Sequence, residues 1–233
     1  MKKEPFLNAP SSILIFAGLL LGIHLLRQFG DEQLGGWLLL NFAFIPKLFS
    51  FEIIRSFSFW EIRPWSVFTY ALLHGNWSHV IMNMLWLLAF GSPVALRFGP
   101  ARFFLFCALA APAGALAHYM VYQHDGLPMI GASAVVSALT AAAVRFCFEP
   151  EGPMFNRGNP RAVFHPAPSL ADNLKNPQAM FFAVTWFVIN FVFGAGASLL
   201  GPDLQIAWQA HIGGFVAGLL LFSLLDPVKR PLS

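Results

Sequence analysis

Charged residues are scarce in this chain, since Asp, Glu, Lys and Arg make up 11% of its 233 residues. Soluble domains usually carry about 25% charged residues, so the composition excludes an ordinary water-soluble domain. The net charge of +3 is too small to indicate nucleic-acid binding. Only two cysteines are present, Cys107 and Cys147; both fall near the predicted cytoplasmic ends of helices, where we expect buried thiols rather than a disulfide.

Apolar stretches take up most of the chain, and 57% of all residues are hydrophobic. A membrane-spanning helix needs about 20 mostly apolar residues. The strands of a membrane barrel would alternate in polarity, whereas these stretches are continuously apolar. The sequence therefore predicts an all-α membrane protein with six transmembrane helices in a single polytopic domain, 1–233. The predicted spans are 11–29, 78–96, 101–123, 131–148, 178–200 and 206–226.

The start of the chain has a basic end and an apolar core, as a secretory signal does. No small-x-small cleavage site follows the core, so we interpret it as a retained first helix. With six spans and both termini on one side, ten of the 14 Lys and Arg residues lie on that side. Cytoplasmic loops carry the excess of basic residues, so both termini are predicted to be cytoplasmic. The ten are Lys2, Lys3, Arg97, Arg102, Arg145, Arg157, Arg161, Lys175, Lys229 and Arg230; the other four are Arg27, Lys47, Arg55 and Arg63.

Two loops are long enough to have a structure of their own. The first, about 27–77, is too polar to span and contains four tryptophans, a residue enriched at the boundary between lipid and water. We expect short helices there, partly embedded in the outer leaflet. The loop 149–177 is rich in Pro and Asn and is expected to be irregular. The sequence assigns no role to it.

Polar side chains inside membrane helices are costly, which makes them functional candidates by default. The segment "HGNWSHVIMN" places His79 and Asn83 four residues apart, on one face of the second helix. The segment "GASA" places Ser133 near the start of the fourth helix. If the N-terminus is cytoplasmic, the second, fourth and sixth helices all run inward from the outer surface. Polar groups near their starts then share one layer below that surface.

The sixth helix completes this layer. In "AHIGGFVAG", His211 stands at the start, and Gly214 and Gly218 follow on its own face. Small residues let membrane helices approach closely, and the fourth helix presents Ser133 with Ser137 one turn later. Close packing of the two helices would let the imidazole reach the hydroxyl and remove its proton during attack on a carbonyl. The backbone N–H of Ser133, with the side chains that the second helix contributes, would stabilise the resulting oxyanion.

These three motifs together resemble the rhomboid family of intramembrane serine proteases. Matching pieces are its His-x4-His-x3-Asn, Gly-x-Ser-x and Ala-His-x-x-Gly-x-x-x-Gly motifs, in family order over about 70–230. The resemblance implies a Ser133–His211 dyad without an acidic third member. It also implies an oxyanion hole at His79 and Asn83, and a supporting role for His74. By resemblance the substrates would be transmembrane proteins, and the location a bacterial inner membrane.

Two positions depart from the family's usual residues. Ser66 stands where many bacterial members have Arg in a Trp-Arg pair of the first loop. Ser137 stands where members often have a Tyr that packs against the catalytic histidine. The first departure bears on the structure of the first loop, and the second on the orientation of His211. Neither removes a reacting group.

Other interpretations remain at this stage. Ser133 alone is equally typical of helix packing. A metal site at His74, His79 and His211 would normally add carboxylate or thiolate ligands, which are missing nearby, so no metal or cofactor is expected. A transporter would have paired inverted halves, which the sequence lacks. A catalytically inactive relative that binds membrane proteins for quality control is the main alternative, although such relatives usually lack the serine or the histidine. The oligomeric state is not indicated.

Overall fold

The computed structural model describes residues 9–156, 158–200 and 207–228, and within these ranges the chain is helical, with no strand. Five of the basic residues counted above (Lys2, Lys3, Arg157, Lys229 and Arg230) and residues 201–206 of the fifth loop lie outside the described residues. The helices are α1 (Ser11–Phe29), α2 (Glu32–Phe42), η1 (Pro46–Phe49), α3 (Phe51–Ser56), α4 (Phe59–Ile62), α5 (Ser66–Thr69), η2 (Tyr70–Leu72), α6 (Trp77–Trp86), η3 (Leu87–Gly91), α7 (Ser92–Tyr122), α8 (Ser133–Cys147), η4 (Ala162–Phe164), α9 (Leu170–Asn173), α10 (Pro177–Leu200) and α11 (Trp208–Leu225).

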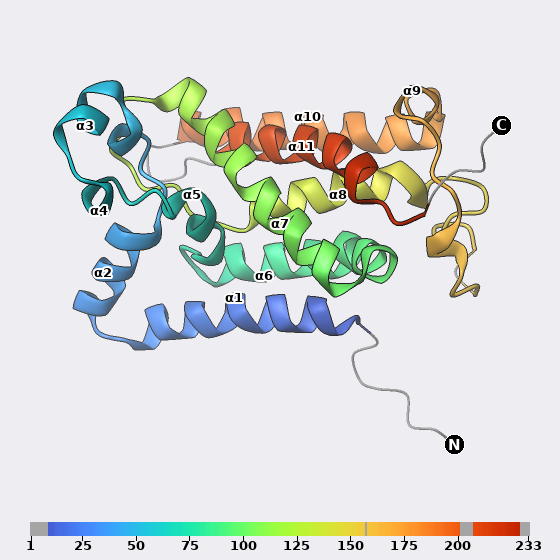
Figure 1. Ribbon diagram of the computed structural model, residues 1–233, viewed down its shortest axis with the longest axis horizontal. Helices are drawn as coiled ribbons and strands as arrows, with labels where there is room; N and C mark the ends of the chain where they lie inside the picture. Colours follow the sequence, from blue (N-terminus) through green and yellow to red (C-terminus); the bar gives the residue numbers. More distant parts are fainter. Residues whose placement is uncertain (1–8, 157, 201–206, 229–233) are drawn as a thin grey trace, which may run out of the picture.

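The length and composition of three described helical segments suit a membrane span: α1, Trp77–Tyr122 and α11. The second of these is 46 residues long and is interrupted at Gly99, which has a φ of 72° and is followed by a proline. Glycine adopts this conformation without steric cost. Figure 1 shows the chain turning back in this region, so that α7 crosses over α6. Two shorter apolar helices, α8 and the segment Pro177–Val192, add to the bundle.

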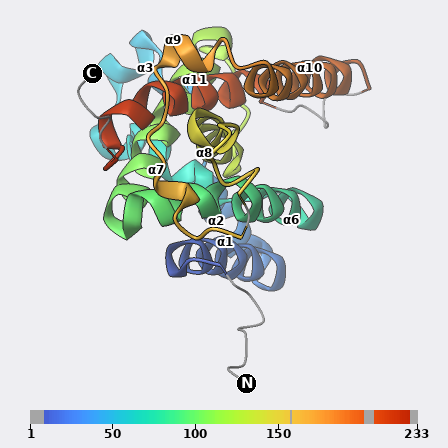
Figure 2. The same cartoon turned by 90° about the vertical axis from the view of Figure 1, so that its right-hand side faces the viewer.

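Helix α8 is the centre of the structure. Every residue of α8 after Ser133 is buried, and most are Ala, Val, Ser or Thr, whose small size lets neighbouring helices approach from all sides. Viewed from the side in Figure 2, α8 is surrounded by the other long helices, and α10 lies at the edge. The position of α8 therefore determines what can contact its first residue.

Helices α8 and α11 run in parallel and touch through backbone atoms. A Cβ atom added to Gly214 would lie 2.0 Å from the carbonyl oxygen of Ala134, and one added to Gly218 would lie 2.3 Å from that of Ala138. The predicted close packing through the two glycines is thus present. The α8 residues at this contact are Ala134 and Ala138, whereas the sequence indicated the neighbouring face of Ser133 and Ser137.

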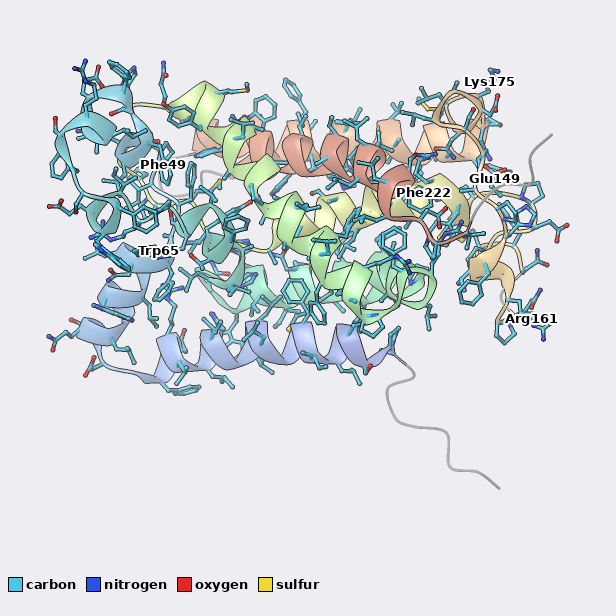
Figure 3. The ribbon with its side chains drawn as sticks, viewed as in Figure 1. Phe49, Trp65, Glu149, Arg161, Lys175 and Phe222 are labelled. Atoms are coloured by element: carbon cyan, nitrogen blue, oxygen red, sulfur yellow. The ribbon has the colours of Figure 1, made fainter. Side chains whose placement is uncertain are left out.

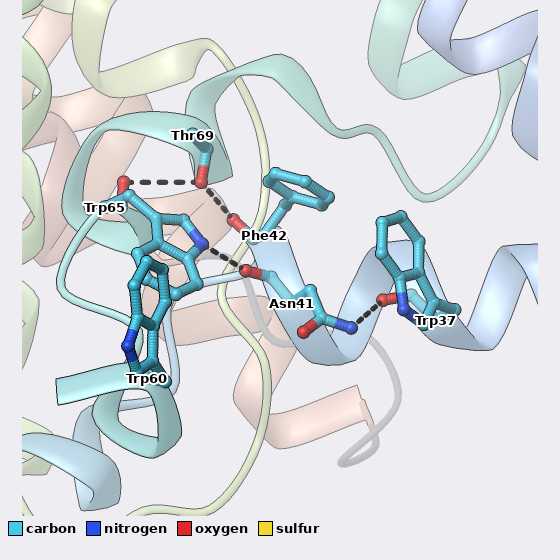
Figure 4. A pocket seen from close by; sticks show the side chains of 6 residues that line it. All are labelled: Trp37, Asn41, Phe42, Trp60, Trp65 and Thr69. Carbon is cyan, nitrogen blue, oxygen red and sulfur yellow. Dashed lines mark hydrogen bonds between the residues drawn. The ribbon is translucent and has the colours of Figure 1, made fainter. Parts of the chain in front are cut away.

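The first loop folds into short helices that are tied to α2. The Trp65 indole donates a hydrogen bond to the Asn41 carbonyl at 2.7 Å, and the Thr69 hydroxyl donates one to the Phe42 carbonyl at 2.9 Å (Figure 4). A cavity of about 480 Å³ opens between these elements, lined mostly by aromatic side chains. Ser66 is buried, so the small side chain at this position fits inside the loop. Embedding of this loop in lipid stays a prediction.

Two arginines anchor the loop 149–177. The buried Arg97 guanidinium donates to the Val163 carbonyl at 2.6 Å and pairs with Asp226 at 2.8 Å. The Arg145 guanidinium donates to the Pro168 carbonyl at 3.1 Å. Figure 3 shows labelled residues of this loop at one end of the helices and labelled first-loop residues at the other end. The two long loops therefore lie at opposite ends of the bundle.

Candidate active site

Ser133 is the first residue of α8 and is half-buried. The chain enters the helix through Gly131, whose φ of 125° is a conformation that favours glycine. The Gly131 N–H donates to the Tyr70 carbonyl at 3.0 Å, and the Ala132 N–H donates to the His74 ring at 3.3 Å. Backbone N–H groups in the first turn of a helix have no partner within the helix, so the start of α8 presents donors beside the serine hydroxyl.

His79 reaches this turn from α6. A Cβ atom at Gly131 would lie 2.7 Å from the His79 Nε2 atom and 3.7 Å from the Ser133 Oγ atom. The imidazole and the hydroxyl thus border the same small space, which exists because residue 131 has no side chain. The N-terminus of α6 is fixed by Asn76, whose side chain accepts a hydrogen bond from the His79 N–H at 2.8 Å.

Asn83 and His74 both contact His79. Asn83 is buried, and its Nδ2 donates to the His79 carbonyl at 2.9 Å; the amide group has a second hydrogen to donate. The rings of His74 and His79 meet edge to face, with centroids 4.9 Å apart. His74 precedes α6 and is fully buried. Burial, followed by the nearby charge of His79, lowers the pKa of His74 to about 3, which keeps its ring neutral and able to accept from Ala132.

His211 enters from α11, in the turn before Gly214. Because Gly214 lies on Ala134 and the two helices are parallel, this preceding turn lies beside the residues that lead into Ser133. His79 is close enough to act electrostatically on His211. The hydroxyl of Ser137 donates to the Ser133 carbonyl at 2.6 Å, so this hydrogen bond lies within α8.

Sequence reasoning missed one polar residue of this region. The Nδ1 atom of His211 lies 2.7 Å from the Oδ1 atom of Asn190, on α10. The signal was available, because an asparagine within "FFAVTWFVINFVF" is a polar residue in an apolar span. Among the described residues, no group of three or more His, Cys, Asp or Glu is arranged to hold a metal ion. The cavity beside α2 described above is distinct from this region, since different residues line it.

The Ser133 hydroxyl, the N–H donors of the first turn and the His79 ring lie around the start of α8, and the α11 turn beside it carries His211, whose Nδ1 hydrogen-bonds to Asn190. Such a set of groups is suited to nucleophilic attack on a carbonyl and to stabilisation of the negative charge that forms on its oxygen. Its members come from α6, α8, α10 and α11. Glycines at two places, in the turn before α8 and on α11, permit the close approach of these helices.

Comparisons with known proteins place the chain in a family. Residues 61–226 match a family model described as the Rhomboid domain. The chain is similar to the rhomboid protease GlpG of Pectobacterium atrosepticum, with 26% identity over 69% of the chain and 48% of the relative. It is also similar to the rhomboid protease GlpG of an Enterobacter species, with 23% identity over 91% of the chain and 62% of the relative. The chain therefore spans about half to three fifths of the length of these relatives.

Proposed function

This chain belongs to the rhomboid family, and from that premise we propose that it is a serine endopeptidase that cleaves membrane proteins within the bilayer. Ser133 is the nucleophile and His211 the general base of this proposal. The observation that supports it most directly is the convergence of α6, α8 and α11. His79 borders the space beside Ser133, and Gly214, one turn after His211, packs against Ala134 at the start of α8.

The reaction begins when the Ser133 hydroxyl attacks the carbonyl carbon of the peptide bond. The Nε2 atom of His211 takes the hydroxyl proton as the new C–O bond forms. The carbonyl oxygen becomes an oxyanion that needs donors. The backbone N–H of Ser133, the second Nδ2 hydrogen of Asn83 and the ring of His79 are the proposed donors, and one such donor is worth about 3–4 kcal/mol in the barrier.

Collapse of this intermediate breaks the C–N bond. The imidazolium of His211 returns its proton to the leaving amine, and an acyl-enzyme ester remains on Ser133. Water, deprotonated by the same imidazole, then attacks the ester and releases the carboxylate product, while the serine recovers its proton. In this scheme His74 is a supporting residue, since its hydrogen bond from the Ala132 N–H holds the turn before the nucleophile.

The proposal includes a topology. We place six spans in the bilayer, with the segment Trp77–Tyr122 counted as two because Gly99 interrupts it, and both termini in the cytoplasm. The two long loops at opposite ends of the bundle (Figure 3) support opposite sides for them. The site then opens toward the outer leaflet. Its substrates are transmembrane proteins whose helices unwind near that leaflet, and the location by similarity is a bacterial inner membrane.

A cleavage assay with purified protein tests the function. The substrate is a single-pass transmembrane protein in detergent or liposomes, compared across wild type, Ser133→Ala and His211→Ala. We expect both substitutions to abolish cleavage, and a fluorophosphonate probe to label wild type but not Ser133→Ala. Ser137→Ala is the matched control, because it removes the next hydroxyl of α8 and should leave labelling intact. Cleavage that survives loss of Ser133 or His211 would contradict the dyad.

A wild-type protein that neither cleaves a broad substrate panel nor takes the probe would point to the other candidate. In that case the chain would be a catalytically inactive rhomboid that binds membrane proteins. Identities of 26% and 23% to the two relatives are compatible with either outcome, so the probe experiment is the first to perform.

A further inference from the structure

Asn190 is an amide in an apolar environment. It is half-buried on α10, between Ile189 and Phe191, which are 48% and 59% exposed on the outer face of that helix. A polar group in such a place is costly unless it is hydrogen-bonded. Both ends of the Asn190 amide have partners: Oδ1 lies 2.7 Å from His211 Nδ1, and Nδ2 donates to the Trp186 carbonyl at 2.8 Å.

These two contacts determine which way the amide faces. A carbonyl oxygen accepts only, so the Trp186 contact requires the NH2 group of Asn190. The Oδ1 atom must then face the imidazole, and it can only accept. The proton of the neutral His211 ring is therefore on Nδ1, and the lone pair is on Nε2. If the amide were flipped, Asn190 Oδ1 would face the Trp186 carbonyl oxygen, so that two acceptors would meet. The NH2 group would then face the ring and favour the tautomer with its proton on Nε2.

Packing holds this part of α10 against α11. Trp186 is buried, and its indole stacks on Phe215 with centroids 4.5 Å apart. Phe215 lies one turn after His211 on α11, just as Trp186 lies one turn before Asn190 on α10. The aromatic pair and the hydrogen bond thus connect the same two helical turns, and the indole also fixes the carbonyl that orients the amide.

We propose that Asn190 is a positioning residue of the active site, which fixes the tautomer and the ring orientation of His211 so that Nε2 faces Ser133. The inference rests on the function proposed above. In serine hydrolases with a triad, an acidic residue holds the ring through Nδ1–H in this way. Here a neutral amide does so, at a site where the residue that usually packs against this histidine in the family is replaced by Ser137.

The test uses full-length protein in detergent and three variants. Asn190→Leu keeps the number of side-chain heavy atoms and the branch at Cγ and removes the acceptor, whereas Asn190→Asp keeps the acceptor oxygen. Thr185→Val is the matched control, since it removes a polar group from an exposed position of the same helix. The first measurement is the side-chain 15N chemical shifts of histidine-labelled protein, with the His211 signals assigned by their loss in His211→Gln. They report which ring nitrogen carries the proton, whether or not the protein cleaves a substrate.

We expect a protonated Nδ1 and an unprotonated Nε2 at His211 in wild type and Thr185→Val, and a mixture of both tautomers in Asn190→Leu. In cleavage assays, Asn190→Leu should lower kcat by about 10- to 100-fold with KM nearly unchanged, because the lost hydrogen bond is strongest when the ring is charged. Asn190→Asp should recover most of kcat. Its carboxylate stabilises the imidazolium, so the acidic limb of the pH–rate profile should move up by about one pH unit. Among the described residues, His79 is a titratable side chain near His211, and all these variants keep it.

Three results would overturn the proposal. The first is a proton on Nε2 of His211 in the wild-type protein. The second is an Asn190→Leu variant with wild-type kcat and tautomer. The third is a loss of kcat in Asn190→Leu that Asn190→Asp neither rescues nor shifts in pH, which would indicate a packing role only. If wild type cleaves nothing, the proposed function fails by itself, and the nitrogen shifts still decide whether Asn190 sets the tautomer.

Discussion

Replacing Gly214 with alanine would change the distance between the two helices that carry the proposed dyad. The added Cβ atom would lie 2.0 Å from the Ala134 carbonyl oxygen and 3.0 Å from the Ala134 Cα atom. Both neighbours are backbone atoms, so no side-chain rotation can relieve the overlap. Because ordinary contact begins at 3.4 Å, α11 and α8 must separate by about 1.4 Å at this point.

This displacement acts where the chemistry is proposed to occur. Ser133 precedes Ala134 in the chain, and His211 lies in the turn before Gly214. Reacting groups must lie about 3–3.5 Å apart, and a misplacement of about 1 Å can lower a rate by 100-fold. We therefore expect Gly214→Ala to lower kcat/KM by about 100-fold or more, which corresponds to about 2.7 kcal/mol in the barrier.

The assay compares cleavage of a transmembrane substrate with the free energy of unfolding in mixed micelles. Gly218→Ala introduces a similar clash, at 2.3 Å from the Ala138 carbonyl oxygen, but one turn farther from the dyad. It should destabilise the bundle to a similar degree and lower activity less. Gly22→Ala on α1, where an added Cβ atom meets nothing within 4 Å, should keep full activity. Wild-type activity in Gly214→Ala would refute the argument that this contact positions the dyad.

Two further substitutions test the surroundings of the site. In Gly131→Ala the alanine must adopt the positive φ of residue 131, and its Cβ atom would lie 2.7 Å from His79 Nε2. We therefore expect at least a 10-fold loss of cleavage. Unchanged cleavage would argue against a role for His79. Asp226→Asn removes the charge that pairs with the buried Arg97 guanidinium and should lower the free energy of unfolding by about 3 kcal/mol. Asp172→Asn breaks an exposed ion pair and should change the free energy of unfolding by less than about 1 kcal/mol. Equal losses in the two variants would contradict the stabilising role of the buried Arg97–Asp226 pair.

The helices that bear the motifs were predictable because their signal is local. A long apolar run sets the extent of a helix, and predicted spans 131–148 and 206–226 correspond to Ser133–Cys147 and Trp208–Leu225. The glycines that allow close packing were identified for the same reason, since they repeat every four residues. The exact partners across the contact were not predictable. Which stripe of α8 meets α11 depends on the rotation of one helix about its axis, and the sequence of α8 is small and apolar on every side.

Asn190 illustrates the same limit. Its polarity in an apolar span marks it as a candidate, but its partner lies on the next helix, 21 residues away. The register between α10 and α11 is set by the stacking of Trp186 on Phe215, and an aromatic pair of this kind has no signature in a single sequence. Motifs thus locate the groups that are proposed to react, while contacts between helices decide which neighbours orient them.

Ser66, which stands where many family members have arginine, is buried in the first loop. A buried guanidinium in the first loop would need carbonyl acceptors, whereas a serine leaves that space to packing. In this chain Arg27, at the end of α1, donates to the backbone carbonyl of His74. His74 in turn accepts from Ala132, so a charge on the first helix is connected through one buried residue to the turn before Ser133. The first helix thus supplies a guanidinium at the residue that contacts the turn before Ser133.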